Sequence, residues 1–246
     1  MSWLDVLFPV PCAGCPVVGA PVCEGCLQSL AGEAVPAWPD PRPSGLPPPW
    51  AVARYESEVR AIVLAYKERA AVGLARALAP PLAAAIRAAA GRAPDVVVVP
   101  VPASAAAIRA RGDDVTDLVV RRAVRQARRD GVHAHVVRAL RHTRRVADSA
   151  GLDASARAAN LAGAFAVRSG AAGAIGTRPA IVADDVITTG TTIAEAARAL
   201  RAAGVEVRGA ATIAATQRHT PAWSRGPGSS GLLGGRPNGA TVGRHG

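Results

Sequence analysis

Apolar residues in this chain follow two alternating patterns, which are short continuous runs and longer stretches with helical spacing. The continuous runs predict β-strands at 51–55, 95–102, 133–137, 165–167, 180–183 and 205–213. Apolar residues three and four positions apart predict helices at 58–69, 73–89, 115–129 and about 191–203. Strands that alternate with helices predict an α/β fold, with a mostly parallel sheet and helices on both faces.

The second predicted helix contains a conflict, because Pro80 and Pro81 lie inside its apolar pattern. A proline removes a backbone hydrogen bond and its ring clashes with the preceding turn, so a kink or break is expected there. Two other stretches lack a regular pattern. Residues 140–159 are irregular and basic, which favours a mobile lid over an anionic substrate. Residues 170–176 are predicted to form a flexible connector.

Composition divides the chain into four predicted parts. Residues 1–35 hold all the cysteines and are expected to form a small metal-binding module. Residues 36–50 are rich in proline, which predicts a stiff, extended linker without packed structure. The main α/β domain is expected at 51–218. Glycine, proline, serine and arginine dominate 219–246, so this end is predicted to be a disordered tail.

The four cysteines have the spacing of a tetrahedral thiolate site. Cys12 and Cys15 form one CxxC pair, and Cys23 and Cys26 form the second. Each short turn can present two sulfurs to one zinc ion, and four protein ligands leave no open position, so a structural zinc is predicted. Two disulfides or a redox-active CxxC are the alternatives. Disulfides are rare in the cytoplasm, and a redox CxxC belongs beside a βαβ unit.

Charge points to an anionic partner. The net charge is +11, and Lys67 is the single lysine among many arginines. Binding of a polyphosphate substrate would account for part of this positive charge, and binding of nucleic acid would account for more of it. For the arginines at 121–129, the alternative is a solvated helix face without a partner. Aromatic residues do not interleave with these arginines, so no stacking platform for single strands is indicated.

Motifs and segments that the sequence lacks argue against two enzyme classes and favour one cellular location. No P-loop and no GxGxxG fingerprint are present, which argues against ATPase and dehydrogenase functions. No signal peptide and no apolar run long enough to span a membrane are visible. A cytoplasmic location without a membrane partner is therefore expected.

The most informative stretch begins with the apolar run 180–183, which ends on Asp184 and Asp185. A loop of hydroxyl residues around Gly190, at 188–192, then leads into a predicted helix. Unpaired backbone N–H groups at a helix N-terminus attract phosphate, and glycine lets the backbone approach closely. Two carboxylates beside such a loop can accept hydrogen bonds from a sugar diol. The stretch therefore predicts a site for a ribose 5-phosphate.

A purely structural alternative for this stretch is a buried strand followed by a capped helix, with both acids solvated. The predicted strand at 95–102 ends in a proline-stiffened loop near Pro100. Ligands of parallel α/β sheets bind at the carboxyl ends of the strands. We therefore expect the Asp184 loop and the Pro100 loop to meet at the site.

The Asp-Asp-Val-Ile-Thr-Thr-Gly-Thr-Thr motif closely resembles the signature of type I phosphoribosyltransferases. The wider layout resembles the ComF family, and the segments that carry this likeness are Cys12 to Cys26, Tyr55 to Lys67, Val99 to Pro102, Arg109 to Gly112, Arg157 to Asn160, Phe165 and Asp184 to Thr192. The resemblance covers residues 12 to about 215. It implies a type I phosphoribosyltransferase-like fold behind a zinc module.

The same resemblance implies roles for individual residues. Asp184 and Asp185 would hold the ribose hydroxyls of phosphoribosyl pyrophosphate. The 5-phosphate would be held by Thr188, Thr189, Gly190, Thr191 and Thr192. Contacts with the pyrophosphate or the site rim would come from Lys67, Arg109 and Arg111. A magnesium ion would accompany the substrate, held mainly by its pyrophosphate and hydroxyl oxygens.

The predicted function is therefore transfer of a phosphoribosyl group to an unidentified acceptor. The family usually continues Arg-Gly with Phe-Asn-Gln, whereas this chain has Asp113, Asp114 and Val115, and a Gln is usual near Ser149. These departures leave the acceptor open. The alternatives are a non-catalytic nucleotide sensor and a competence or DNA-uptake adaptor that binds single-stranded DNA or a helicase.

Overall fold

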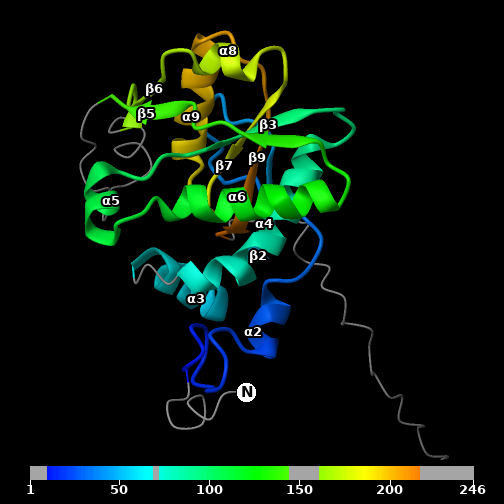
Figure 1. The fold of residues 1–246 in the computed structure, drawn as a ribbon, viewed down its shortest axis with the longest axis vertical. Helices are drawn as coiled ribbons and strands as arrows, with labels where there is room; N and C mark the ends of the chain where they lie inside the picture. The colour runs from blue at the N-terminus through cyan, green and yellow to red at the C-terminus, as the bar shows by residue number, and fades with distance from the viewer. Residues whose placement is uncertain (1–9, 69–71, 144–160, 217–246) are drawn as a thin grey trace, which may run out of the picture.

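The computed structural model describes residues 10–68, 72–143 and 161–216, and their central feature is a seven-stranded sheet (Figure 1). Its strands are β1 (Val35–Pro36), β2 (Pro49–Arg54), β3 (Val96–Pro100), β4 (Ala134–Val136), β7 (Ala180–Ala183), β8 (Val186–Ile187) and β9 (Val207–Ala215). The order is β1-β2-β9-β7-β3-β4 with β8 beside β9, and every pairing is parallel except that of β1 with β2. The mostly parallel sheet expected from the sequence is confirmed.

Strands β3 and β7 are neighbours inside the sheet, and every residue in them is buried. Both are continuous apolar runs because a parallel strand inside a sheet is covered on its two faces. The register pairs Val99 with Val182 and Pro100 with Ala183, so the two strands end together. The loops that follow them therefore leave the sheet side by side.

Helices cover both faces of the sheet. They are α2 (Glu24–Ser29), α3 (Ser57–Glu68), the 3₁₀ helix η1 (Val72–Leu74), α4 (Ala75–Ala90), α5 (Ala105–Arg111), α6 (Val115–Arg129), α8 (Ala171–Ile175) and α9 (Thr191–Ala202). Helices α3, α4 and α6 share one apolar core with Val96 and Val98, whereas α8 and α9 share a second core with Val97 and Val99. Successive strand residues point to opposite faces, so one run of valines stabilises both layers.

Helix α4 continues through Pro80 and Pro81, so the predicted break is wrong. The carbonyl that loses its partner to Pro80 belongs to Arg76, which is exposed and can be solvated. Leu78 and Leu82, on either side of the prolines, are fully buried. Burial of these side chains, at about 1.5–3 kcal/mol each, outweighs the loss of backbone hydrogen bonds.

Two further stretches differ from expectation. Residues 171–175 of the predicted flexible connector form the short helix α8, in which Ala171 and Ile175 are buried. The first part of the predicted lid is β5 (Leu140–His142), which pairs antiparallel with β6 (Phe165–Val167) in a separate two-stranded sheet. The rest of that lid, from 144 onwards, lies outside the described residues, as does the predicted tail from 217.

The proline-rich segment at 36–50 is packed, so the prediction of a linker without packed structure is wrong. Ala37 and Leu46 are buried in the core beside α9. Arg201 of α9 donates a hydrogen bond to the carbonyl of Gly45, and Trp38 stacks under the guanidinium of Arg42. A proline has no N–H to satisfy, so a proline-rich strand segment can pack on a domain with few backbone hydrogen bonds.

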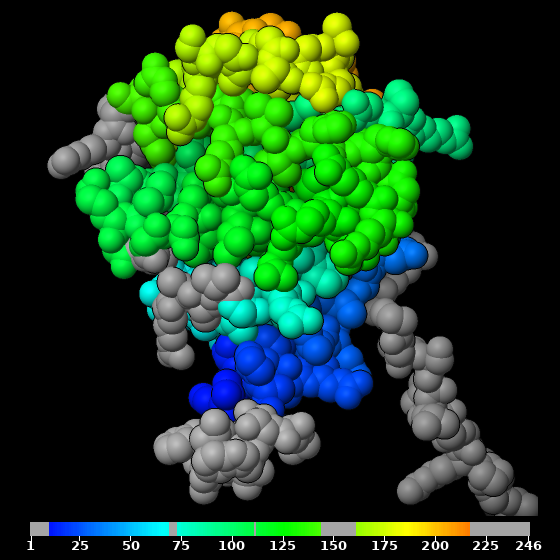
Figure 2. All heavy atoms as spheres, in the orientation of Figure 1, coloured from blue at the N-terminus to red at the C-terminus, as the bar shows by residue number. Residues whose placement is uncertain are grey.

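The cysteine-containing segment lies at one end of the molecule, against α3 (Figures 1 and 2). Cys12, Cys26 and Leu30 belong to the same apolar core as Val59 and Ile62 of α3. None of the helices in the described parts of the chain has the length and apolar character needed to cross a membrane.

Candidate functional site

The two adjacent carboxylates lie where β7 ends. Asp184 donates its backbone N–H to Ala211, and its side-chain Oδ1 accepts the N–H of Asp185 at 2.8 Å. Asp185 is only 3% exposed, and its Oδ2 lies 2.8 Å from the ammonium of Lys67 at the end of α3. The chain thus places its single lysine against one acid of the predicted motif.

Asp184, Asp185 and Lys67 line one cleft, of about 230 Å³. The other residues that line it are Val101, Pro102, Ala103, Ser104, Ala107, Val115 and Thr116. The predicted meeting of the Asp184 loop with the loop after Pro100 is therefore confirmed. Both loops follow strands that end at the same level, which is where ligands of parallel sheets bind.

Electrostatics in the cleft are set by two acids and one base in a small, largely buried space. Burial, together with the neighbouring charge of Asp185, raises the pKa of Asp184 to about 8. Burial works against the charged form of Lys67, but the carboxylates of Asp185 and Asp184 outweigh it and raise the pKa of Lys67. The cleft therefore carries little net charge near neutral pH.

The raised pKa of Asp184 makes stability depend on pH. The folded state binds the proton of Asp184 more tightly than the unfolded state does. The resulting contribution to the free energy of unfolding is complete below the ordinary pKa of 3.8 and is lost as the pH rises through about 8. We expect Asp184→Asn to match the wild type near pH 4 and to exceed its free energy of unfolding at pH 9 by on the order of a few kcal/mol. Urea unfolding across this pH range measures the difference in free energy of unfolding between the two proteins. A difference that does not change with pH would contradict the prediction.

The hydroxyl-rich loop at 188–192 follows β8 and leads into α9. Within the described residues, no acceptor bonds the backbone N–H groups of Thr189, Gly190, Thr191 or Thr192. Gly190 has a φ of 74°, and a Cβ there would lie 3.0 Å from Leu46. Glycine is therefore required both by the backbone conformation and by the packed proline-rich segment.

The structure does not place this loop on the walls of the acid cleft. Thr191 instead lines a separate depression of about 700 Å³ along α9, together with Glu195, Arg198 and Arg201. The Glu195 carboxylate is buried and is held by Arg198 through two hydrogen bonds. The open amides of the loop and the acid cleft are thus two adjacent features joined by β8.

The structure does not place either of the two predicted arginine contacts, Arg109 and Arg111, in the cleft. Arg109 is exposed on α5 and does not line the cleft, although Ala107 and Ser104 nearby do. The backbone of Arg111 ends α5, but its side chain lies outside what the structure describes. Both roles stay predictions.

Sequence reasoning missed three residues of the cleft region. Ser104 caps α5 and Thr116 lies in the first turn of α6; both line the cleft. Tyr66 is fully buried, and its hydroxyl donates to the carbonyl of Val115 at 2.6 Å. Asp114 before an apolar helical pattern is a capping signal that marks the start of α6. The predicted helix at 115–129 already had Thr116 in its first turn, but nothing in the sequence connected that turn with the cleft.

The four cysteines converge as their spacing predicts. Their sulfur atoms all lie within 4.8 Å of one another, and none forms a disulfide. Burial disfavours the thiolate of Cys12, but N–H groups of Cys23 and Gly14 offset it and lower its pKa to about 6. Four converging sulfurs, one already stabilised as a thiolate, fit a metal such as zinc.

This cluster is docked on the helix that carries Lys67. A Cβ on Gly14 would lie 2.8 Å from the sulfur of Cys26 and 3.1 Å from Ile62 of α3. Ser29 donates a 2.6 Å hydrogen bond to Glu58, also on α3. Any loss of order in the cysteine segment would therefore uncover one face of α3.

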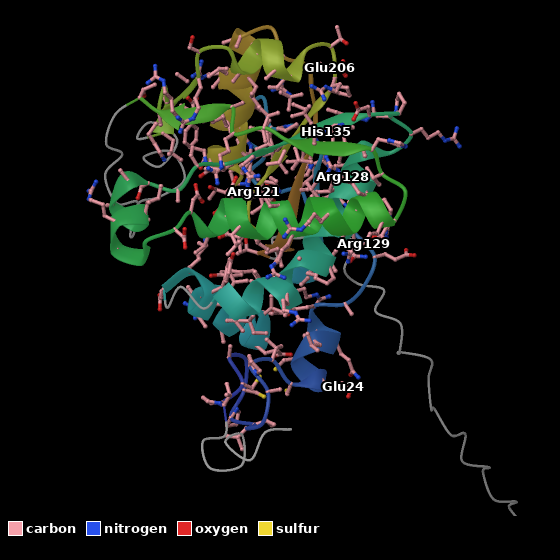
Figure 3. All side chains as sticks on the ribbon, viewed as in Figure 1. Glu24, Arg121, Arg128, Arg129, His135 and Glu206 are labelled. Atoms are coloured by element: carbon pink, nitrogen blue, oxygen red, sulfur yellow. The ribbon has the colours of Figure 1, made fainter. Side chains whose placement is uncertain are left out.

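On the arginine-rich helix α6, Arg121, Arg128 and Arg129, which Figure 3 labels, are exposed, whereas Arg122 is partly buried. Some are engaged: Arg121 pairs with the buried Asp117, and Arg128 donates to the carbonyl of Ala134. A nucleic-acid partner for this face stays a prediction, beside the alternative of a solvated helix.

Comparison with known proteins adds no relative. No protein-family model matches the chain, and no curated protein matches it. The functional interpretation therefore depends on the geometry of the cleft and on the motifs themselves.

Proposed function

We propose that this protein binds phosphoribosyl pyrophosphate, or a related ribose 5-phosphate ligand, and transfers the phosphoribosyl group to an acceptor with release of pyrophosphate. One observation carries the proposal: the adjacent acids Asp184 and Asp185 face a cleft beside Lys67, at the carboxyl ends of β3 and β7. This is the position at which parallel α/β sheets bind their ligands.

Asp184 and Asp185 suit a sugar diol. Each carboxylate can accept two hydroxyl hydrogen bonds, and a largely buried setting strengthens such bonds. In the reaction, the bond between C1 of ribose and the pyrophosphate oxygen breaks, and a bond from C1 to a nucleophile of the acceptor forms. The sugar becomes cationic as pyrophosphate leaves, so the charged carboxylate of Asp185, joined by that of Asp184 once it has lost its proton, would stabilise it, and Lys67 would complement the leaving group.

The loop at 188–192 suits the 5-phosphate. Its N–H groups at the start of a 12-residue helix have no acceptor in the described parts of the chain. The loop also carries hydroxyls, among which those of Thr189 and Thr191 bond each other at 3.0 Å. A phosphate there would replace missing hydrogen-bond acceptors and meet the positive end of the helix dipole.

The ComF family fits these features best, because its members join this type of site to an N-terminal four-cysteine zinc module. The zinc would be structural, since four thiolates leave no open position. Within the described residues, the cysteines are the only group of three or more metal-ligating side chains. Magnesium would therefore be held chiefly by oxygens of the ligand, with Asp184 or Asp185 as the nearest protein carboxylates.

Calorimetry with phosphoribosyl pyrophosphate in magnesium-containing buffer tests the proposal. We expect the wild type to bind and Asp184→Asn/Asp185→Asn to lose at least roughly tenfold in affinity, because the amide side chains accept fewer hydroxyl bonds and carry no charge. Asp130→Asn is the matched control, since this acid pairs with Arg87 away from the cleft. Unchanged affinity in the double variant, or no binding by the wild type, would refute the assignment.

A further inference from the structure

Helix α3 connects the two candidate sites of the molecule. Its first half contacts the cysteine segment, and its last turn carries Lys67, whose ammonium lies 2.8 Å from Asp185 in the acid cleft. The chemistry of the two sites is separate, so neither assignment requires this connection. It is nevertheless direct, because a single helix of 12 residues makes both sets of contacts.

The first half of α3 is held by the cysteine segment. Ser29 donates a 2.6 Å hydrogen bond to the carboxylate of Glu58. Gly14, inside the first CxxC pair, approaches the helix so closely that a Cβ there would lie 3.1 Å from both Glu58 and Ile62. The same Cβ would lie 2.8 Å from the sulfur of Cys26. The cysteine cluster and this surface of α3 therefore pack directly on each other.

The last turn of α3 is held by the walls of the cleft. Tyr66 is fully buried, and its hydroxyl donates to the carbonyl of Val115 at 2.6 Å. The next residue, Lys67, pairs with Asp185, which is 3% exposed. Ile62 and Tyr66 are four residues apart and lie on the same face of the helix. That face is therefore packed continuously from the cysteine segment to the start of α6.

The support of α3 comes mainly from its neighbours in sequence. Among the described helices and strands, α3 packs chiefly on α2, which carries Cys26, and on the short helix η1 that follows it. The cysteine segment has few apolar side chains of its own, so its order depends on the metal that its four sulfurs fit. A helix that is supported by such a segment shares its local stability.

We propose that metal binding by the four cysteines is coupled to the arrangement of the acid cleft through α3. Two states of the helix follow, one docked on the ordered, metal-bound segment and one released from it. Only the docked state holds Lys67 against Asp185 and Tyr66 against Val115. Coupling between two sites is reciprocal, so the contacts at the cleft end of α3 also favour retention of the metal.

Metal release tests the coupling without any ligand. The full zinc-loaded chain is mixed with a chromogenic chelator at concentrations where the rate no longer depends on the chelator, so that opening of the segment limits release. We expect Tyr66→Phe and Lys67→Met to release zinc at least roughly fivefold faster than the wild type, which is the lower end of typical coupling between sites. Arg87→Met is the matched control, because it breaks the ion pair of α4 with Asp130 and should not change the rate.

The reverse direction is measured as the rate of acylation of Lys67, counted by mass spectrometry. Removal of zinc should raise this rate at least roughly fivefold, since the released helix no longer holds the ammonium against Asp185. Ser29→Ala keeps all four cysteines but loses the hydrogen bond to Glu58. It should therefore raise the acylation rate of the zinc-loaded protein, by a smaller factor.

Amide hydrogen exchange in the same samples separates release of α3 from global unfolding. The central sheet should stay protected when zinc is removed, whereas α3 should lose protection. A sheet that loses protection together with α3, a chain that binds no zinc, or release and acylation rates that match the wild type in all variants would overturn the coupling.

One consequence rests on the proposed function. Phosphoribosyl pyrophosphate with magnesium should slow zinc release from the wild type at least roughly threefold, because a ligand in the cleft favours the docked helix, and should not slow it in Asp184→Asn/Asp185→Asn. This result would support both proposals. Ligand-free rates as expected, without an effect of the ligand, would support the coupling and count against the proposed function alone.

Discussion

Cys26→Ser is expected to remove zinc from the protein and to unfold the segment around residues 10–30, while the central sheet stays folded. The segment packs few apolar side chains of its own, and a four-thiolate zinc site contributes on the order of 10–16 kcal/mol of apparent folding free energy. Serine is close in size to cysteine but supplies no thiolate. Losing one of four converging sulfurs should therefore abolish tight binding.

The measurement combines zinc stoichiometry with amide hydrogen exchange. In the variant, protection should fall within the cysteine segment and along α3, since Cys26 and Leu30 share a core with Ile62. Val17→Ser is the matched control, because Val17 is 52% exposed in the same segment and is not a ligand. One zinc per chain retained by Cys26→Ser, with wild-type protection, would show that the cysteines do not form the predicted site.

Lys67→Met is expected to destabilise the fold, although it replaces a charged side chain by an apolar one. It leaves the carboxylate of Asp185, at 3% exposure, buried without its partner and next to a second acid. Breaking a fully buried ion pair costs about 3–5 kcal/mol and breaking an exposed pair about 0–1, so this half-exposed lysine should contribute about 1–3 kcal/mol.

A double-mutant cycle isolates this pair. Lys67→Met should cost much less in an Asp185→Asn background, because the amide is neutral and needs no cation. Urea unfolding at pH 7 gives the four free energies. Arg87→Met serves as control, since its pair with Asp130 is more exposed and longer, at 3.5 Å. Equal costs of Lys67→Met in both backgrounds would contradict an energetic link between Lys67 and Asp185.

Sequence pattern was sufficient for the elements whose burial leaves a strong signature. The valines of β3 and the apolar run of β7 predicted parallel strands because both faces of each strand are covered. The cysteine spacing likewise predicted the convergence of four sulfurs, since two short turns leave little other geometry. In both cases the local sequence is sufficient to predict the local structure.

Pattern failed where tertiary contacts decide the structure. Helix α4 tolerates Pro80 and Pro81 because Leu78 and Leu82 are buried against other elements, which local propensity does not register. The composition of the proline-rich segment predicted no packing, but Leu46 lies against Gly190, a contact between residues far apart in sequence.

The candidate site shows the same limit. Asp184 and Asp185 were predictable from the order of strand, acids and hydroxyl-rich loop. Thr116 was not, because only the parallel register of the sheet and the hydrogen bond from Tyr66 bring the start of α6 to the cleft. Arg109 was placed at the site by resemblance, and the structure leaves it exposed outside the cleft.

The position of Lys67 has a practical consequence for chemistry on this protein. It is the single side-chain amine of the chain, and its side chain is 38% exposed at the cleft. An acylating reagent attacks the neutral amine, so the ion pair with Asp185 should slow modification, and an occupant of the cleft should slow it further. Mass-spectrometric counting of one acyl group, apart from that on the α-amine, would thus act as an occupancy gauge for screening unknown ligands.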